Sequence, residues 1–160
     1  MKQEDFSALA ERYMGLVYRV ALNCVGHPAD ADDVTQNVML RTFRSAPEFE
    51  GEEHARRWLI RVTVNESRRL LTAPWRRRTV ALEELEGALP AQPREDLELL
   101  EQVLALPAKY RLPLYLYYYE GYSVEEVGRL TGRKASTVQT QLARGREQLK
   151  NLLKEVGYYG

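Results

Sequence analysis

Polar and basic side chains that can contact DNA recur between residues 134 and 144. Ser, Thr and Gln can hydrogen-bond to base edges, with Gln favouring adenine, and Arg and Lys can bind phosphates. The candidate residues are Lys134, Ser136, Thr137, Gln139, Thr140, Gln141 and Arg144. Their spacing indicates a recognition helix that can contact duplex DNA. A surface helical hairpin with a polar face is the alternative.

The residues just before this stretch predict the elements that position it. Ser123 and Glu126 form a capping box, which starts a short helix. Gly132 supplies the turn that ends the short helix, and the small Gly128 lets the next helix approach closely. We therefore expect a helix-turn-helix whose second helix runs over about residues 135–154.

Charge is distributed unevenly along the chain. Residues 56–78 carry eight arginines and one acid, for +7, and residues 129–154 carry seven basic side chains and one acid, for +6. Residues 83–101 lie between them and carry seven acids and one Arg. This asymmetry predicts two polyanion-facing surfaces with an acidic connector. Solvated helix faces would give the same pattern without a ligand.

The whole-chain composition excludes several classes of protein. The 160 residues contain 23 basic and 23 acidic side chains, with 44% hydrophobic residues, which is typical of one foldable domain or two small ones. A single cysteine, Cys24, excludes an internal disulfide and a multi-cysteine zinc site, and two histidines leave little for metal or acid–base chemistry. No apolar run approaches a membrane span and no signal core follows the N-terminus. We expect a cytoplasmic protein with no membrane insertion, cofactor, metal or small-molecule substrate.

Helical periodicity dominates, and no alternating strand pattern of useful length is present. Apolar residues at spacings of three and four, with Pro and Gly as breaks, predict the following helices: residues 6–24, 29–45, 53–72, 94–106, 109–120, 124–131 and 135–154. Residues 74–93 contain Pro74, Pro90 and Pro93 and are typical of an extended, mobile linker. The predicted fold class is all-α, with two small helical domains, 1–73 and 94–160, joined by this flexible linker.

Tyrosine is concentrated before the helix-turn-helix. Six of the ten tyrosines lie between Tyr110 and Tyr122. They could stack on bases, but aromatics at helical spacing beside several leucines are more often core, with their hydroxyls at the surface. We expect them to be core residues, and Cys24 to be an inert core thiol.

With these parts in order, the chain resembles the extracytoplasmic-function (ECF) class of bacterial RNA polymerase sigma factors. Residues 30–40 look like the polymerase-binding helix of that family, with an acidic start, a Gln and an apolar stripe. Residues 49–51 and 58–65 look like its promoter-melting segment. Residues 106–127 look like the entry to its C-terminal helix-turn-helix, and residues 136–146 look like its recognition helix.

The resemblance implies two partners, core RNA polymerase and promoter DNA, and often an anti-sigma factor as a third. It places these residues on the polymerase-docking stretch: Asp30, Asp32, Asp33, Gln36 and Asn37. Asn65 matches a position that helps hold a flipped minus-ten base, and Arg61, Arg68 and Arg69 would supply cations around it. The helix-turn-helix would hold the minus-thirty-five element in the major groove. Gln139 and Gln141 stand where relatives commonly carry Arg or Lys, so the promoter sequence is not transferable.

Two other functions fit parts of the sequence. A free-standing helix-turn-helix regulator would bind specific duplex DNA without polymerase, although no extra dimerisation segment is visible. A nucleic-acid hydrolase could use the clustered acids Asp30, Asp32 and Asp33, but two-metal chemistry needs convergent carboxylates. Because these three lie within four residues at a helix start, they do not all face one way, and we expect no enzymatic activity.

Overall fold

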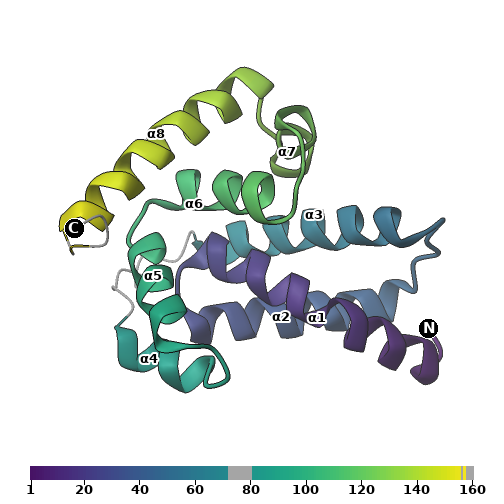
Figure 1. Ribbon diagram of the computed structural model, residues 1–160. Helices are drawn as coiled ribbons and strands as arrows, with labels where there is room; N and C mark the ends of the chain where they lie inside the picture. Colours follow the sequence, from purple (N-terminus) through teal and green to yellow (C-terminus); the bar gives the residue numbers. More distant parts are fainter. Residues whose placement is uncertain (72–80, 156, 158–160) are drawn as a thin grey trace.

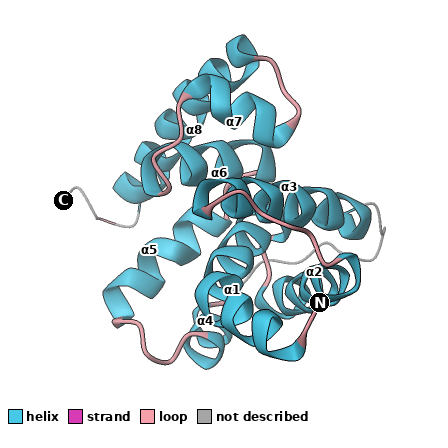
Figure 2. Cartoon of the chain, turned by 90° about the vertical axis from the view of Figure 1, so that its right-hand side faces the viewer, coloured by secondary structure: helices cyan, strands magenta, loops and turns pink. Residues whose placement is uncertain are grey.

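The first three helices form one bundle. The computed structural model describes residues 1–71, 81–155 and 157, and all regular structure in these residues is helical (Figures 1 and 2). Helices α1 (Gln3–Val25), α2 (Pro28–Ser45) and α3 (Glu52–Leu71) confirm the three expected N-terminal helices within a few residues. Gly26 ends α1 in the left-handed region at φ 75°. His27 then caps α2 by accepting a hydrogen bond from the Ala29 N–H at 3.2 Å.

A short helix interrupts the segment that was expected to be extended. Helix α4 (Leu82–Ala88) lies within the predicted linker, and its Leu85 is completely buried. The Glu84 carboxylate lies 2.5 Å from His27 Nε2 and ties α4 to the start of α2. The composition predicted an extended chain here, because prolines lie on either side of Leu82 and Leu85. Packing of an apolar face against the bundle can nevertheless stabilise even a short helix.

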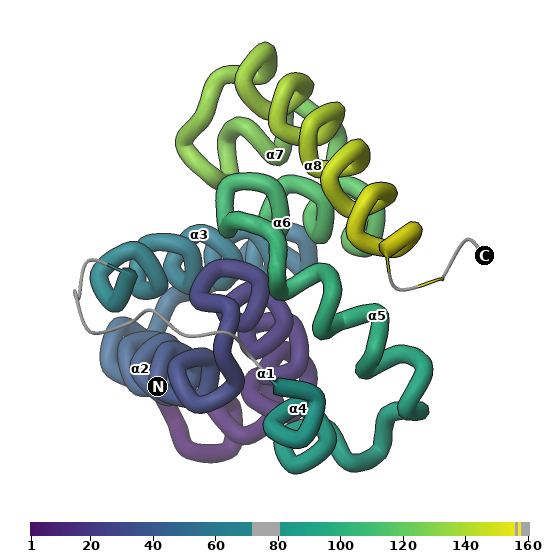
Figure 3. The backbone as a smooth tube through the Cα atoms, turned by 90° about the vertical axis from the view of Figure 1, so that its left-hand side faces the viewer, coloured from purple at the N-terminus to yellow at the C-terminus, as the bar shows by residue number. Residues whose placement is uncertain are grey.

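The C-terminal helices pack against the top and one side of the N-terminal bundle as drawn in Figure 1. They are α5 (Arg94–Leu104), α6 (Ala108–Leu114), the π-helical turn η1 (Tyr115–Tyr119), α7 (Val124–Thr131) and α8 (Ala135–Glu155). Helix α6 lies between the α1–α3 bundle and α8 (Figure 1). Helix α5 descends from α6 along one side of the bundle toward α4 (Figure 3). The single helix expected over residues 109–120 is therefore an α-helix that continues as a π-turn.

The tyrosine prediction is wrong for half of the cluster. Tyr110 and Tyr122 are buried, and Tyr115 is half-buried. The other three, Tyr117, Tyr118 and Tyr119, are 36%, 57% and 66% exposed. Consecutive residues of a helix point in different directions, so a run of three tyrosines cannot share one buried face.

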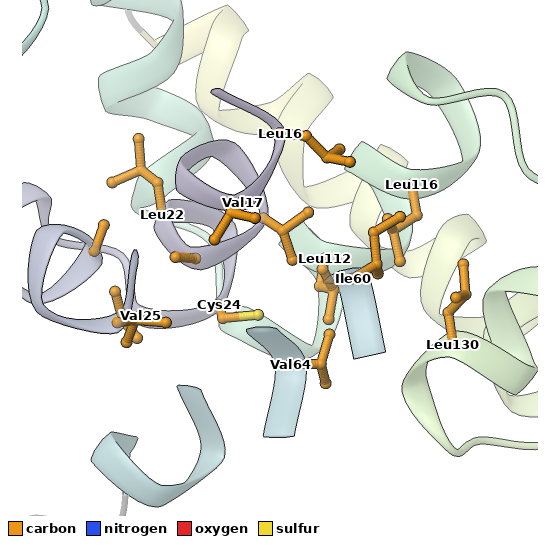
Figure 4. Packing of buried hydrophobic residues seen from close by; sticks show 14 of the residues in the cluster. Leu16, Val17, Leu22, Cys24, Val25, Ile60, Val64, Leu112, Leu116 and Leu130 are labelled. Atoms are coloured by element: carbon orange, nitrogen blue, oxygen red, sulfur yellow. The ribbon is translucent and has the colours of Figure 1, made fainter. Parts of the chain in front are cut away.

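One continuous hydrophobic core joins the two groups of helices. Leu16 and Val17 of α1 and Ile60 of α3 approach Leu112 of α6 and Leu116 of η1 (Figure 4). All five side chains are nearly or completely inaccessible to water. The N-terminal bundle and the helix-turn-helix region are therefore packed against each other in this structure.

Candidate nucleic-acid interface

The helix-turn-helix forms as its local sequence predicts. The Glu126 N–H donates to Ser123 Oγ at 3.1 Å, and the Ser123 N–H donates to Glu126 Oε1 at 3.0 Å, which completes the capping box. These hydrogen bonds hold the pKa of the Glu126 carboxyl below its ordinary value. Gly132 has φ 71°, in the left-handed region that glycine adopts without strain. Helix α8 then leaves the turn at a fixed angle to α7.

Five of the seven predicted reading residues lie together on α8. Ser136, Thr137, Thr140, Gln141 and Arg144 line a groove of about 380 Å³, and Lys109 and Tyr110 of α6 complete it. Gln139 and Lys134 lie outside this groove.

Some of these side chains already have partners within the protein. The Thr140 hydroxyl donates to the Ser136 carbonyl at 3.2 Å, and Arg133 Nη1 donates to Gln141 Oε1 at 3.1 Å. Sequence reasoning missed Lys109, whose signal was a cation two residues after Pro107, at the start of the next helix.

The cationic face of α3 points toward the helix-turn-helix. Residues Arg57, Arg61, Asn65 and Arg68 follow one another at helical spacing and share a side of α3. Arg61 lines a cleft of about 320 Å³ between α3 and α7. Arg68 Nη2 donates to the carbonyl oxygen of Thr131 at the end of α7. The predicted melting surface thus borders the first helix of the helix-turn-helix, while Arg61, Asn65 and Arg68 remain exposed.

Arg69 lies on a different side of α3 from Arg61 and Arg68. Its Nη1 lies 3.1 Å from the carboxylate of Glu66. It also borders a groove of about 430 Å³ between α2 and α3, together with Arg41, Arg44 and Asn37. Sequence reasoning missed the two α2 arginines, although their spacing from Asn37 places all three on one helix face. The structure therefore separates the four predicted melting residues into two cationic surfaces.

The predicted docking stretch borders an apolar groove. Asp32 and Gln36 line a hollow of about 630 Å³ between α1 and α2. Its apolar wall includes Met14, Leu40 and Phe43, which are 44%, 47% and 39% exposed. Burial and the neighbouring Asp32 carboxylate raise the pKa of Tyr18 to about 12.

The other members of the docking stretch do not line this groove, and Asn37 borders the groove between α2 and α3 instead. Asp33 and Asn37 are exposed, and Asp30 is half-buried at the start of α2. Within residues 1–71, 81–155 and 157, no three His, Cys, Asp or Glu side chains are placed to hold a metal ion. None of the helices described in these ranges has the length and apolar character needed to cross a bilayer.

The single thiol lies where the two groups of helices meet. Cys24 is buried at the end of α1 and points toward Val64 and Leu112 (Figure 4). Burial raises the pKa of its thiol to about 11.

Cys24 is expected to resist alkylation in the folded protein. Because the folded pKa is raised, the unreactive neutral thiol dominates below about pH 11. At pH 8, iodoacetamide should modify Cys24 at least about a hundredfold more slowly than in urea-unfolded protein, from the thiolate fractions alone. Mass spectrometry of timed aliquots measures both rates. Equal rates in the two states would contradict the burial of this thiol.

Comparison with known protein families finds a match for each of the two groups of helices. The family model for Sigma-70 region 2 matches residues 9–77, and the model for Sigma-70, region 4 matches residues 96–149. Together with the helix-turn-helix and the cationic α3, these matches define the chain as a protein of the sigma-70 class.

Individual relatives identify the subclass of sigma factors to which the chain belongs. The chain is 32% identical to the ECF RNA polymerase sigma factor SigE of Mycolicibacterium smegmatis over 93% of its own length, and it spans 62% of that relative. It is 26% identical to the ECF RNA polymerase sigma factor SigW of Bacillus subtilis, over 96% of this chain and 91% of the relative. The chain belongs to the ECF class of sigma factors.

Solved structures share the fold. The sigma factor RpoE of Bartonella quintana, in complex with the anti-sigma factor NepR, matches with a TM-score of 0.71 at 17% identity, over 94% of this chain and 98% of RpoE. CnrH, in complex with the cytosolic domain of CnrY, matches with a TM-score of 0.65 at 25% identity, over 96% of this chain and 90% of CnrH. The all-α architecture is therefore confirmed.

Proposed function

We propose that this chain is a transcription initiation factor that binds core RNA polymerase and directs it to specific promoters in the cytoplasm, without catalysis of its own. Residues 1–73 dock on polymerase and open the minus-ten element, residues 94–160 hold the minus-thirty-five element, and residues 74–93 connect them. The observation that carries the proposal is the pairing of the α8 reading groove with the cationic α3 in a chain of the ECF class.

The groove between α1 and α2 suits a polymerase surface. Exposed Met14, Leu40 and Phe43 form an apolar area, and Asp32 and Gln36 border it with polar groups. An apolar centre with a polar rim is typical of a protein–protein interface. The acidic residues at the start of α2 would select a basic partner surface.

The reading face of α8 suits the major groove of the minus-thirty-five element. Ser136, Thr137 and Gln141 can contact base edges, and Arg144, two turns further on, can bind a phosphate. Because few cations line this groove, we expect a modest salt dependence of binding by this unit alone. Asn65, exposed between Arg61 and Arg68 along α3, is the proposed contact of an extruded minus-ten base.

An anti-sigma factor is a further proposed partner. RpoE is solved with NepR and CnrH with the cytosolic domain of CnrY, and both share the fold of this chain. A stand-alone regulator remains the alternative function, but it leaves the α1–α2 groove and the cationic α3 without a role.

The direct test is binding to core polymerase followed by transcription. The tagged chain should retain purified bacterial core polymerase and direct run-off transcripts from a subset of a genomic promoter library. Specific, tight duplex binding without polymerase, together with no retention of core enzyme, would favour the regulator instead.

Substitution of Asn65 by alanine tests the proposed minus-ten contact. Asn65→Ala should reduce promoter opening about tenfold, since losing hydrogen bonds to an extruded base costs ~1–2 kcal/mol. Polymerase binding should not change. Permanganate reactivity of unpaired thymines measures the opening. Asn151→Ala, which removes an exposed asparagine late in α8, is the control, and an equal loss in both variants would remove Asn65 from the site.

A further inference from the structure

A hollow of about 590 Å³ lies where α1, α5, α6, η1 and α8 meet. None of the residues proposed to contact DNA or polymerase lines it. Leucines of four helices form much of its lining: Leu22, Leu97, Leu100, Leu114 and Leu149. Pockets that bind small molecules enclose roughly 300–1,000 Å³ and are mostly apolar, with a few polar groups that orient the ligand. The size and lining of this hollow therefore suit a small-molecule ligand.

The wall formed by α5 is apolar over two helical turns. Leu99, Leu100 and Val103 all line the hollow, with Asp96 near the start of the helix. From Asp96 to Val103 the helix rises ~10 Å, and α5 follows the side of the bundle from α4 up to α6 (Figure 3). Leu99 is 37% exposed. A long apolar wall that water reaches favours a ligand with an extended aliphatic part.

The part of the hollow formed by η1 carries guanidinium and hydroxyl groups. Arg19 of α1 donates through Nε to the Tyr115 hydroxyl at 2.9 Å, and its guanidinium lies 5.5 Å from the centre of the Tyr119 ring. Arg146 of α8 donates through Nη1 to the Tyr118 hydroxyl at 2.6 Å. A hydroxyl that accepts a hydrogen bond keeps its own hydrogen to donate. Arg146 and Tyr118 can therefore donate together to an acceptor on a ligand.

The charges around the hollow favour an anionic ligand. Three arginines line it, Arg19, Arg111 and Arg146, against one acid, Asp96. The buried carboxylate of Glu120 lies 3.7 Å from Arg19 Nη2 and offsets that charge. Arg146 is exposed and pairs with no acid among the residues that the structure describes. Because hydrogen bonds between a guanidinium and a carboxylate are strong, a carboxylate is the ligand group that Arg146 fits best.

An amphipathic helix of a partner protein is the other kind of occupant for an apolar hollow. With its side chains an α-helix is ~10–12 Å wide, so two turns, ~11 Å long, occupy on the order of 1,000 Å³. The hollow provides about 590 Å³, little more than half of that volume. A single flexible aliphatic chain with one charged end fits this space, and we therefore favour a small amphipathic anion.

We propose that the hollow between α1, α5, η1 and α8 binds an aliphatic carboxylate of the fatty-acid type. The aliphatic chain lies along the apolar wall of α5, and the carboxylate accepts hydrogen bonds from Arg146 and from the Tyr118 hydroxyl. The site goes beyond the proposed function, because its ligand is neither DNA nor a protein. It also gives a role to Tyr118, which is 57% exposed and contributes little to the core.

Decanoate, used below the concentration at which it forms micelles, tests this site in the full chain. Isothermal titration calorimetry should show saturable binding of one molecule per chain. Arg146→Gln should weaken binding about tenfold, since it removes the charged partner of the carboxylate. Lys150→Gln removes another exposed cation of α8, outside the hollow, and should bind like wild type. Decanol, which has the same chain without the charge, should bind wild type and Arg146→Gln equally.

A second pair of variants tests the apolar wall. Leu99→Gln should weaken decanoate binding several-fold, because it removes apolar contact with the chain of the ligand. Leu71→Gln changes a leucine that is 41% exposed at the end of α3, outside the hollow, and is the matched control. A ligand that binds the folded chain alone also raises Tm, by about 5 °C at a hundredfold excess over Kd. This shift should be smaller in Leu99→Gln than in Leu71→Gln at the same decanoate concentration.

Three results would overturn the site. They are no saturable decanoate binding, equal affinity of wild type and Arg146→Gln for decanoate, and equal affinity of the Leu99 and Leu71 variants. If decanoate fails to bind and an amphipathic helical peptide instead shifts the amide resonances of α5 and η1, the hollow is a protein-docking surface and the proposal is wrong. Binding to core polymerase is measured separately, so failure of the ligand site leaves the proposed function standing.

Discussion

Replacement of Gly128 by alanine is expected to abolish specific DNA binding by the helix-turn-helix. A Cβ atom at this position would lie 2.6 Å from the carbonyl oxygen of Arg133, closer than real Cβ contacts allow. The obstacle is backbone, and the Arg133 N–H donates to the Gly128 carbonyl at 2.9 Å, so the turn itself must open. We expect a destabilisation of about 1–3 kcal/mol, the range for forced overpacking. The start of α8 would shift and carry the reading residues out of register.

Gly87→Ala is the matched control for this prediction. Gly87 lies in α4, where an added Cβ atom would meet open space, with no packing neighbour within 4 Å. Alanine there should leave DNA binding unchanged and stabilise the chain by ~0.5 kcal/mol, because it lowers the entropy of the unfolded state. Urea denaturation and a gel-shift titration with minus-thirty-five duplex measure both effects. Tight, specific binding by Gly128→Ala would show that the turn accommodates the methyl group.

Arg111→Met is expected to destabilise the whole closed structure by at least about 3 kcal/mol. Arg111 of α6 is buried, and its Nε and Nη2 donate to the carbonyls of Asn23 at 3.0 Å and Cys24 at 3.2 Å. Its Nη1 also donates to the carbonyls of Leu104, at 3.2 Å, and Leu106. Carbonyls in the last turn of a helix lack helical partners, so methionine would leave several buried acceptors unsatisfied at ~1–3 kcal/mol each.

An exposed arginine provides the comparison for Arg111. Arg94 is 65% exposed and pairs with Glu86 at 2.5 Å and Glu98 at 3.2 Å. Because water screens such pairs, Arg94→Met should cost less than about 1 kcal/mol. Thermal and urea denaturation followed by circular dichroism measures both variants. Equal stability of Arg111→Met and wild type would mean that water replaces the guanidinium at the end of α1.

Two sets of polar contacts hold the two groups of helices together, and salt should affect them differently. Arg111 holds the end of α1 to α6, while Glu120, directly after η1, pairs with Arg56 of α3 and Arg19 of α1. The Arg111 guanidinium binds uncharged carbonyl oxygens, whereas the Glu120 carboxylate pairs with positively charged guanidinium groups. We expect salt to weaken the pair between Glu120 and the exposed Arg19 more than the Arg111 contacts, since buried groups are screened less.

Local sequence signals predicted most of the helices. Periodic apolar residues marked α1, α2 and α3, and Gly26 and Pro28 marked the break between the first two. The capping box at Ser123 and the turn at Gly132 located the helix-turn-helix. These features act between residues three to five positions apart, so they can be recognised without knowledge of the fold.

The candidate site was only partly predictable, because local spacing gives the face of a helix on which a residue lies but not the neighbour that this face meets. Helical spacing placed Ser136, Thr140 and Arg144 on one face, and the structure lines them along one groove. It could not assign Arg69 to the α2 side and Arg68 to the α7 side, because which face of α3 meets which neighbour depends on packing. Helix α4 escaped prediction because burial of Leu85 outweighs local composition.

The sequence by itself determined the helix order, the turn chemistry and the two basic segments, all of which depend on residues close together in the chain. The tertiary structure alone decided that α7 packs beside α3 and that Glu120 meets Arg56, which lies 64 positions away in the sequence. No local pattern marks such a pair, since the energy of a buried charge depends on which partners and how little water surround it once the helices have packed. Whether the basic surfaces are available to DNA is therefore a property of the packing between the two units.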